Sequence, residues 1–133
     1  MRKEVTFVSV LKAGGIAGII GAGFNNLWSL VAYALGATIP AGFAIAIVFS
    51  SVLPVLVGSV VYFMLIKFIP RGRTVWIALG LGLLVASFYP VADPPPFQDG
   101  TLPDETFPLL VGPMHIISGG LALWGIPRWT DKL

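Results

Sequence analysis

The sequence contains no cysteine and few charged side chains. Without cysteine the chain has no disulfide, no thiolate metal site and no cysteine nucleophile. The absence of cysteine also does not indicate whether the protein faces an oxidising or a reducing compartment. Charged residues make up 11% of the 133 residues, whereas an average soluble domain carries about 25%. A soluble protein of this size needs more polar surface than that. The scarcity of charge therefore argues against a water-soluble domain.

Catalytic motifs are absent as well. The sequence has no HExxH, GxSxG, P-loop or GxGxxG pattern, and these are short motifs that mark metal, nucleophile and nucleotide sites. No pair of carboxylates falls inside an apolar run. We therefore expect neither an enzyme nor a nucleic-acid-binding protein, because the basic residues have the topological explanation given below.

Apolar residues, by contrast, make up 56% of the chain. They gather in four runs, at about residues 14–35, 42–66, 75–92 and 109–126. A helix needs about 20 mostly apolar residues to cross the hydrocarbon of a bilayer. Helices and closed barrels are the structures that satisfy every backbone polar group there. The sequence predicts an all-α fold, a bundle of four transmembrane helices in a single membrane domain over residues 1–133.

The first apolar run invites comparison with a secretory signal peptide, because Arg2 and Lys3 precede it. A signal peptide has an uninterrupted apolar segment of about 7–15 residues after its basic start. Lys12 interrupts the apolar stretch here. We expect the first run to be a retained span, with residues 1–12 forming an interfacial turn or extending the helix.

The four apolar runs separate the basic residues from an acidic segment. Basic residues precede the first run, lie between the second and third, and follow the fourth: Arg2, Lys3, Lys12, Lys67, Arg71, Arg73, Arg128 and Lys132. Segment 93–108 instead carries Asp93, Asp99, Asp104 and Glu105. Basic loops stay on the cytoplasmic side. We predict a multi-pass protein of a bacterial inner membrane, with both termini and loop 67–74 in the cytoplasm and loop 93–108 outside.

Small residues line one stripe of the first run, at Gly14, Gly18, Gly21 and Ala22. Gly14 and Gly18 form a GxxxG pair. Helices in lipid associate through close backbone approach, which small residues permit. The stripe predicts packing inside the bundle, and the alternative is a contact with another subunit or a second copy.

Polar residues inside the runs form the candidate site. Counting about 1.5 Å per residue along each helix, each run supplies polar or helix-breaking residues near the middle of the bilayer. An amide or imidazole facing lipid costs several kcal/mol, so these side chains are expected to face inward. They form either a polar core that fixes helix register or a small binding cavity. The candidates are Asn25, Asn26, Ser50, Ser51, Ser87, His115 and Ser118.

His115 is the single histidine, and ionisable residues inside a membrane are functional candidates. A proton relay needs a carboxylate partner, which is not predicted at this depth. The imidazole can serve as one axial ligand of a haem or chlorophyll-type pigment. A neutral imidazole bonded to Asn25, Asn26 or a serine is simpler. We therefore predict no metal and no cofactor, and we expect bound lipids.

The last run begins after an acidic loop and contains Pro113-Met114-His115-Ile116-Ile117. With the asparagines of the first run, Arg71-Gly72-Arg73 and Ser87-Phe88-Tyr89-Pro90, this pattern resembles a family of small bacterial four-helix membrane proteins of unknown function. The resemblance covers about residues 10–127, and its loop at 93–108 is longer and richer in proline here. It implies the same fold and topology, and no activity.

Two functions fit these features. The first is a non-enzymatic accessory subunit that packs into a larger membrane complex, such as an energy-converting one. The alternative is a binder or carrier of a small lipophilic molecule or cofactor, with its site around Asn25, Asn26 and His115. A pore is less compatible, because four helices with so few polar residues do not line an aqueous path.

Overall fold

The computed structural model describes residues 4–97 and 99–133, and all regular elements within these residues are helical. Four helical segments are long and apolar enough to cross a membrane: Phe7–Ala34, Phe43–Phe68, Gly72–Ala92 and Phe107–Thr130. The predicted all-α class with four apolar helical segments is thus confirmed. The elements are α1 (Phe7–Ala34), α2 (Phe43–Phe68), α3 (Gly72–Ala86), α4 (Tyr89–Ala92), α5 (Phe107–Gly120), the π-helical turn η1 (Leu121–Gly125) and α6 (Ile126–Thr130).

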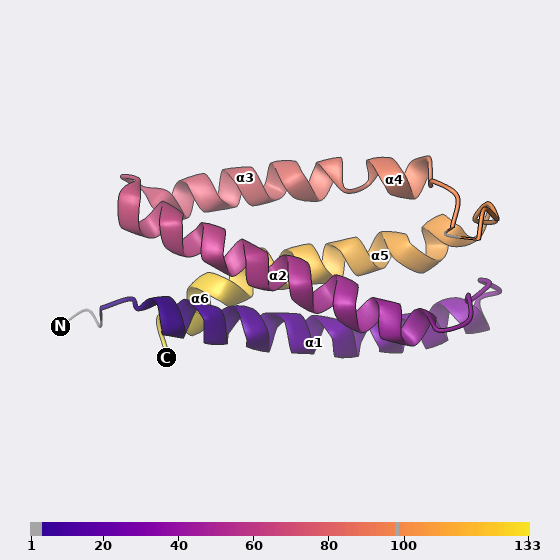
Figure 1. Ribbon diagram of the computed structural model, residues 1–133, viewed down its shortest axis with the longest axis horizontal. Coiled ribbons are helices and arrows are strands. Elements are labelled where there is room, and N and C mark those ends of the chain that lie inside the picture. The colour runs from indigo at the N-terminus through magenta and orange to yellow at the C-terminus, as the bar shows by residue number, and fades with distance from the viewer. Residues whose placement is uncertain (1–3, 98) are drawn as a thin grey trace.

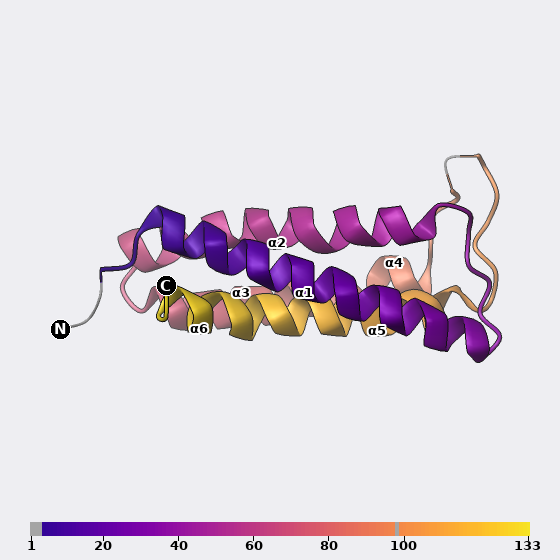
Figure 2. The ribbon, with the colours of Figure 1, turned by 90° about the horizontal axis from the view of Figure 1, so that it is seen from below.

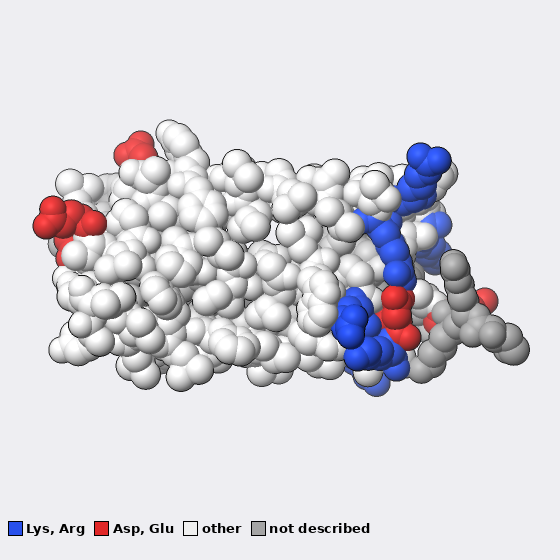
Figure 3. Space-filling view, turned by 180° about the vertical axis from the view of Figure 1, so that it is seen from behind, with Lys and Arg blue, Asp and Glu red and all other residues white. Residues whose placement is uncertain are grey.

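The four segments run alongside one another in an elongated bundle (Figures 1 and 2). The start of α1, the C-terminus and the α2–α3 turn lie at one end, which we call the basic end. Its described basic residues are Lys12, Lys67, Arg71, Arg73, Arg128 and Lys132. The α1–α2 and α4–α5 connections lie at the other, acidic end. Figure 3 shows the two groups of charges separated by a long uncharged surface.

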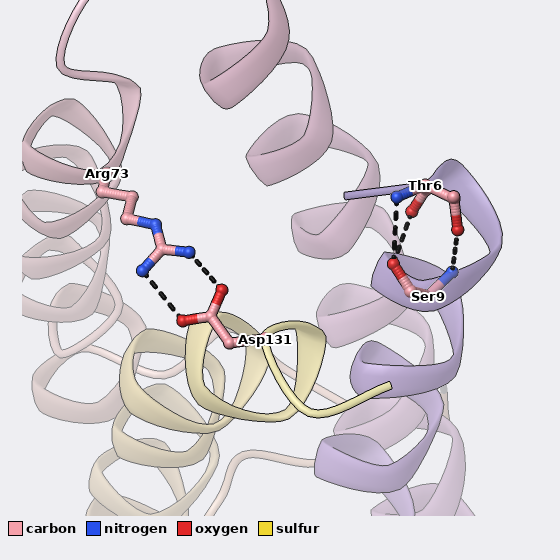
Figure 4. Close-up of polar contacts among 4 residues, drawn as sticks. All are labelled: Thr6, Ser9, Arg73 and Asp131. Atoms are coloured by element: carbon pink, nitrogen blue, oxygen red, sulfur yellow. Dashed lines mark hydrogen bonds and ion pairs between the residues drawn. The ribbon is translucent and has the colours of Figure 1, made fainter. Parts of the chain in front are cut away.

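The first helix begins at Phe7, seven residues before the predicted residue 14. Thr6 explains the early start, because its side chain accepts a hydrogen bond from the Ser9 N–H, and Ser9 Oγ accepts one from the Thr6 N–H (Figure 4). Such a reciprocal cap satisfies N–H groups that a helix start leaves free. At the other end, Gly36 takes a left-handed φ of 97°. The Ala37 N–H then bonds to the Ala32 carbonyl and closes the helix.

The third segment differs from the single span predicted at 75–92. Helix α3 starts at Gly72 and ends at Ala86, and the short helix α4 follows. Pro90 explains the break, because it has no N–H to bond to the carbonyl of Ala86 four residues earlier. The predicted loop 67–74 correspondingly shrinks to Ile69–Arg71, in which Arg71 has a left-handed φ of 60°.

The fourth segment extends to Thr130, beyond the predicted end at 126. Pro127 lies within it and would clash, in a regular α-helix, with the carbonyl of Leu123. Leu123 belongs to η1, where the wider π-helical turn makes room for the proline ring. Pro113, near the start of α5, has no N–H to bond to the carbonyl of Leu109 four residues earlier, so that carbonyl is freed. The Trp28 indole N–H donates to that carbonyl at 3.2 Å.

Helices α1 and α2 pack most closely, at the small-residue stripe. A Cβ at Gly14 would lie 2.6 Å from the Cβ of Ser59, and one at Gly18 would lie 3.0 Å from the Cα of Val52. A Cβ at Gly21 would instead approach Leu121 and Ser118 of the last segment. The most apolar stretch of α1 is 44% buried, against 11% for that of Gly72–Ala92. The third segment is therefore the least enclosed of the four.

The interior consists of two apolar clusters with polar residues between them. The cluster toward the basic end contains Tyr62, Trp76 and Ile126. The cluster toward the acidic end contains Ile47, Leu110 and Met114. Asn25 and Ser51 are buried between the two clusters along α1 and α2. The candidate site therefore lies where the apolar packing is interrupted.

The glycine stripe gives a direct test of the packing. Gly14→Ala should lower the free energy of unfolding by about 1–3 kcal/mol, because the added methyl overlaps Ser59. Gly15→Ala is the matched control, since its methyl meets nothing within 4 Å. It should raise stability by about 0.5–1 kcal/mol through helix propensity. Thermal unfolding in detergent measures both, and equal effects would contradict the close α1–α2 contact.

Candidate functional site

Asn25 connects three helices through its amide. Nδ2 donates to Ser51 Oγ of α2 at 2.9 Å and to Ser118 Oγ of α5 at 2.8 Å. Asn25 is 3% exposed, and no residue of the described chain donates to its Oδ1. Interhelical bonds of this kind are worth about 0.6–2 kcal/mol each in apolar surroundings. The amide therefore fixes the register of three segments and keeps one acceptor free.

The other predicted polar residues satisfy themselves within their own helices. The Asn26 amide donates to the Ala22 carbonyl at 2.9 Å, one turn back in α1. The hydroxyls of Ser50 and Ser87 donate to the carbonyls of Ile47 and Leu84. Such local bonds need no partner on another helix. The single inward-facing layer expected from the sequence is thus reduced, in its interhelical bonds, to Asn25 and two serines.

His115 makes none of the expected hydrogen bonds. Its imidazole has no hydrogen-bond partner among residues 4–97 and 99–133. The N–H groups of Asn25 donate to serines instead, and the Asn26 amide donates to the backbone of α1. The ring is half-buried and lies 5.9 Å from the Phe88 ring, centroid to centroid. The imidazole is therefore available to another molecule.

Two cavities meet at His115. The first, which we call the Asn25 cavity, has a volume of about 310 Å³ and lies between α1, α2 and α5. The second, the Trp76 groove, has a volume of about 410 Å³ and lies between α2, α3 and the last segment. Ser50, His115 and Ser118 line both. The two spaces thus adjoin along one side of α2, and each falls within the size range of small-molecule sites.

The lining of the two spaces differs in chemistry. The Asn25 cavity has polar groups from Asn25, Ser50, Ser51, His115 and Ser118 beside apolar ones such as Phe43 and Ile47. The Trp76 groove is mainly apolar: its other lining residues are Pro54, Val55, Val57, Gly58, Val61, Trp76, Leu79, Gly80, Leu83, Leu84, Ser87, Gly119, Ala122 and Leu123. Of the seven polar candidates, all except Asn26 line at least one of the two spaces.

Pro54 adds a backbone acceptor where the two spaces meet. A proline inside a helix removes the hydrogen bond to the carbonyl four residues earlier. Pro54 lies inside α2, so the carbonyl that loses its helical partner belongs to Ser50. Ser50 lines both the cavity and the groove. The mid-bundle region therefore offers more acceptors than the helices themselves use.

A third cavity, of about 300 Å³, lies at the basic end, where Thr6, Phe63, Lys67 and Arg73 are among the residues that line it. Arg73 forms a two-bonded ion pair with Asp131 (Figure 4). Lys67 Nζ lies 5.3 Å from the centre of the Phe63 ring. These exposed cations already have partners, so the mid-bundle spaces have the stronger claim as a site.

The connection between α4 and α5 covers the acidic end with local turns. The Thr106 hydroxyl donates to Asp104 Oδ1 at 2.6 Å and holds the pKa of that carboxyl below its usual range. Thr106 Oγ1 also accepts from the Thr38 N–H at 3.0 Å, which joins the connection to the α1–α2 loop. Asp99 and Thr101 form a similar pair. The carboxylates are used in these turns rather than in the mid-bundle site.

Sequence reasoning did not find the apolar residues that form the groove, such as Leu79, Leu83 and Leu123. An apolar residue in a chain that is 56% apolar carries no signal of its own. Pro54 and Gly58, which leave space on α2, were the available clues. No group of three or more His, Asp or Glu that could hold a metal ion occurs in the described part of the chain. His115 as an axial ligand of a haem or chlorophyll-type pigment stays an alternative that the sequence leaves open.

Comparison with known proteins adds no identity: neither a protein-family model nor a curated protein nor a solved structure matches the chain. The resemblance to the small four-helix family stays a prediction. The function therefore has to be argued from the residues around Asn25 and His115.

Substituting each of the two neighbouring asparagines tests whether the interhelical hydrogen bonds of Asn25 stabilise the bundle. Asn25→Leu should lower the free energy of unfolding by about 1–2 kcal/mol, because it removes both interhelical bonds to serines. Asn26→Leu serves as the matched control and should change stability little, since its bond stays within α1. Thermal unfolding in detergent compares them. A larger loss for Asn26→Leu would show that the register does not depend on Asn25.

Proposed function

We propose that the four apolar segments cross the inner membrane of a bacterium, with the basic end in the cytoplasm and the acidic end outside. Length and hydropathy support insertion, because each segment has at least 21 residues. The charge separation along the bundle supports the orientation (Figure 3), since basic loops are retained on the cytoplasmic side. Both chain termini are then cytoplasmic.

The lack of cysteine makes the orientation testable with single thiols. Ile69 in the α2–α3 turn and Leu102 in the α4–α5 connection are 43% and 73% exposed. In intact cells with a permeable outer layer, a membrane-impermeant maleimide should label Leu102→Cys. It should label Ile69→Cys only after the inner membrane is opened. Equal labelling of both in intact cells would refute the topology.

Within that membrane, we propose that the protein binds a small lipophilic molecule along α2. The observation that carries this proposal is the Trp76 groove, a mainly apolar space of about 410 Å³ that adjoins His115, an imidazole without a hydrogen-bond partner in the described residues. Ligand sites are typically apolar spaces with a few polar groups that orient the ligand. Here the apolar walls hold the body of the ligand, and the imidazole contacts its polar end.

The groove is less enclosed on its α3 side, which favours entry of a ligand from the bilayer. Helix α3 forms one wall, and its buried residues, Gly72 and Trp76, lie near the basic end. The large side chains of Leu83 and Val85, farther along, are 61% and 74% exposed. A wall with few buried contacts separates from its neighbours at low free-energy cost. A lipophilic molecule can then reach the groove sideways from lipid.

Quenching of Trp76 fluorescence tests the groove, because this indole lines it. The probe is 12-bromododecan-1-ol, whose bromine quenches tryptophan on contact, and the Trp76→Phe variant supplies the background from the other tryptophans. Quenching should be saturable. Val57→Phe should weaken probe binding roughly tenfold by filling the groove. Val60→Phe, on α2 but outside the groove lining, should not.

Thermal unfolding of both variants serves as the folding control, since the two valines are exposed by 64% and 39% and neither is needed for the core. Quenching that rises without saturation, or that responds equally to both substitutions, would mean that the probe only partitions into the surrounding detergent or lipid.

An accessory subunit of a larger membrane complex is the second candidate. The third segment favours it, because only 11% of its most apolar stretch is buried within the chain. Another subunit can cover this surface, as can lipid. Native mass spectrometry after gentle extraction separates the two functions: a subunit retains a partner protein, and a binder retains a small molecule.

A further inference from the structure

The Asn25 amide leaves one specific requirement unmet. Its two N–H groups donate to Ser51 Oγ and Ser118 Oγ. Its Oδ1 is buried and receives no donor from the described residues. A buried acceptor without a donor costs free energy, which a suitable partner recovers. Asn25 lines a cavity of about 310 Å³, and Oδ1 itself is closed to solvent, so a bound molecule reaches this acceptor once a side chain of the cavity wall moves aside.

The same cavity indicates which chemical group the molecule carries. Asn25 Oδ1 and the Ser50 carbonyl that Pro54 frees are both acceptors. Esters, ketones and carboxylates are themselves acceptors and cannot satisfy them. An ammonium group donates, but a charge buried without a carboxylate is costly, and the carboxylates of Asp93, Asp99, Asp104 and Glu105 lie at the acidic end. A hydroxyl is neutral and donates, so it meets both requirements.

The adjoining groove indicates what the hydroxyl is attached to. The Trp76 groove continues from Ser50 along α2 to Val61, which is about 16 Å at the α-helical rise. Its walls beyond Ser50 are mainly aliphatic, and Trp76 lies toward the basic end. A single water can satisfy Asn25 but leaves the apolar groove unfilled. A molecule with a polar head and one apolar tail fills both spaces.

We propose that the occupant is a long-chain alcohol, a neutral lipid whose hydroxyl donates to Asn25 Oδ1 while its tail lies in the Trp76 groove. This inference rests on the proposed binding function and specifies its ligand class. His115 and Ser118, which line both spaces, contact the junction of head and tail. Asn25 thus has a second role beside its structural one, as the residue that selects for a donor.

The test compares two probes that differ in the donor alone. 12-Bromododecan-1-ol and its methyl ether have the same brominated tail, but the ether oxygen can only accept. A site built to receive a hydroxyl discriminates against an analogue that lacks it. The alcohol should therefore bind about tenfold more tightly, as measured by saturable Trp76 quenching. In Asn25→Leu that preference should disappear, so that the alcohol and the ether bind with equal affinity.

A second measurement needs no substitution. In 2-bromododecan-1-ol the bromine sits at the head, beside Asn25 and far from Trp76, so this isomer should quench Trp76 much less than the 12-bromo isomer. Equal binding of alcohol and ether would overturn the ligand class and leave groove binding intact. Equal quenching by the two bromo isomers would overturn the orientation. Absence of saturable quenching by alcohol and ether alike would remove the proposed function as well.

Discussion

The bonds from Asn25 to Ser51 and Ser118 are the interaction on which the arrangement of the helices depends. Apolar side chains along four similar helices give attraction without direction, since one leucine packs much like another. A buried amide, by contrast, has two donors at a fixed angle and a free-energy cost when they are unpaired. Sliding α2 or α5 by one turn would move its serine about 5.4 Å away. The two apolar clusters on either side then pack in one register.

The prolines show how the same requirement is met in several ways. Each removes one backbone hydrogen bond, and the bundle deals with the freed carbonyl or the steric clash differently. The Trp28 indole satisfies the carbonyl that Pro113 frees. At Pro90 the chain simply ends α3, and before Pro127 it widens into a π-helical turn. At Pro54 the freed carbonyl is that of Ser50, which lines both cavity and groove. Among these prolines, Pro54 therefore frees a carbonyl at a residue that lines the candidate site.

Much of the architecture could be predicted from sequence because it depends on averages. Four long apolar runs specify four helices whatever their detailed contacts, and the glycine stripe specifies a close contact for α1. The site, by contrast, depends on the direction in which each polar side chain points. Counting residues per helical turn predicts that direction poorly. Asn25 and Asn26 are adjacent in sequence, yet one bridges three helices and the other bonds its own turn. The depth of His115 in the span did not predict that the neighbouring amides would donate to other groups and leave the imidazole without a hydrogen bond. The helix start at Thr6 was readable only with its partner Ser9 in view.

The position of the groove follows from the way α2 is shared between its neighbours. Its face toward α1 is closed by glycine, since Gly14 and Gly18 bring the two backbones together. Its face toward α3 has Pro54 and Gly58, which have little side chain to fill the space. Trp76 closes that space near the basic end, where it packs on Tyr62 at 5.5 Å between ring centres. Farther along, α3 lines the groove with Leu79, Leu83 and Leu84. A tight α1–α2 pair and a loosely packed α3 thus leave an apolar space beside the free acceptor of Asn25, and that combination makes an amphiphile a better occupant than either water or a purely apolar molecule.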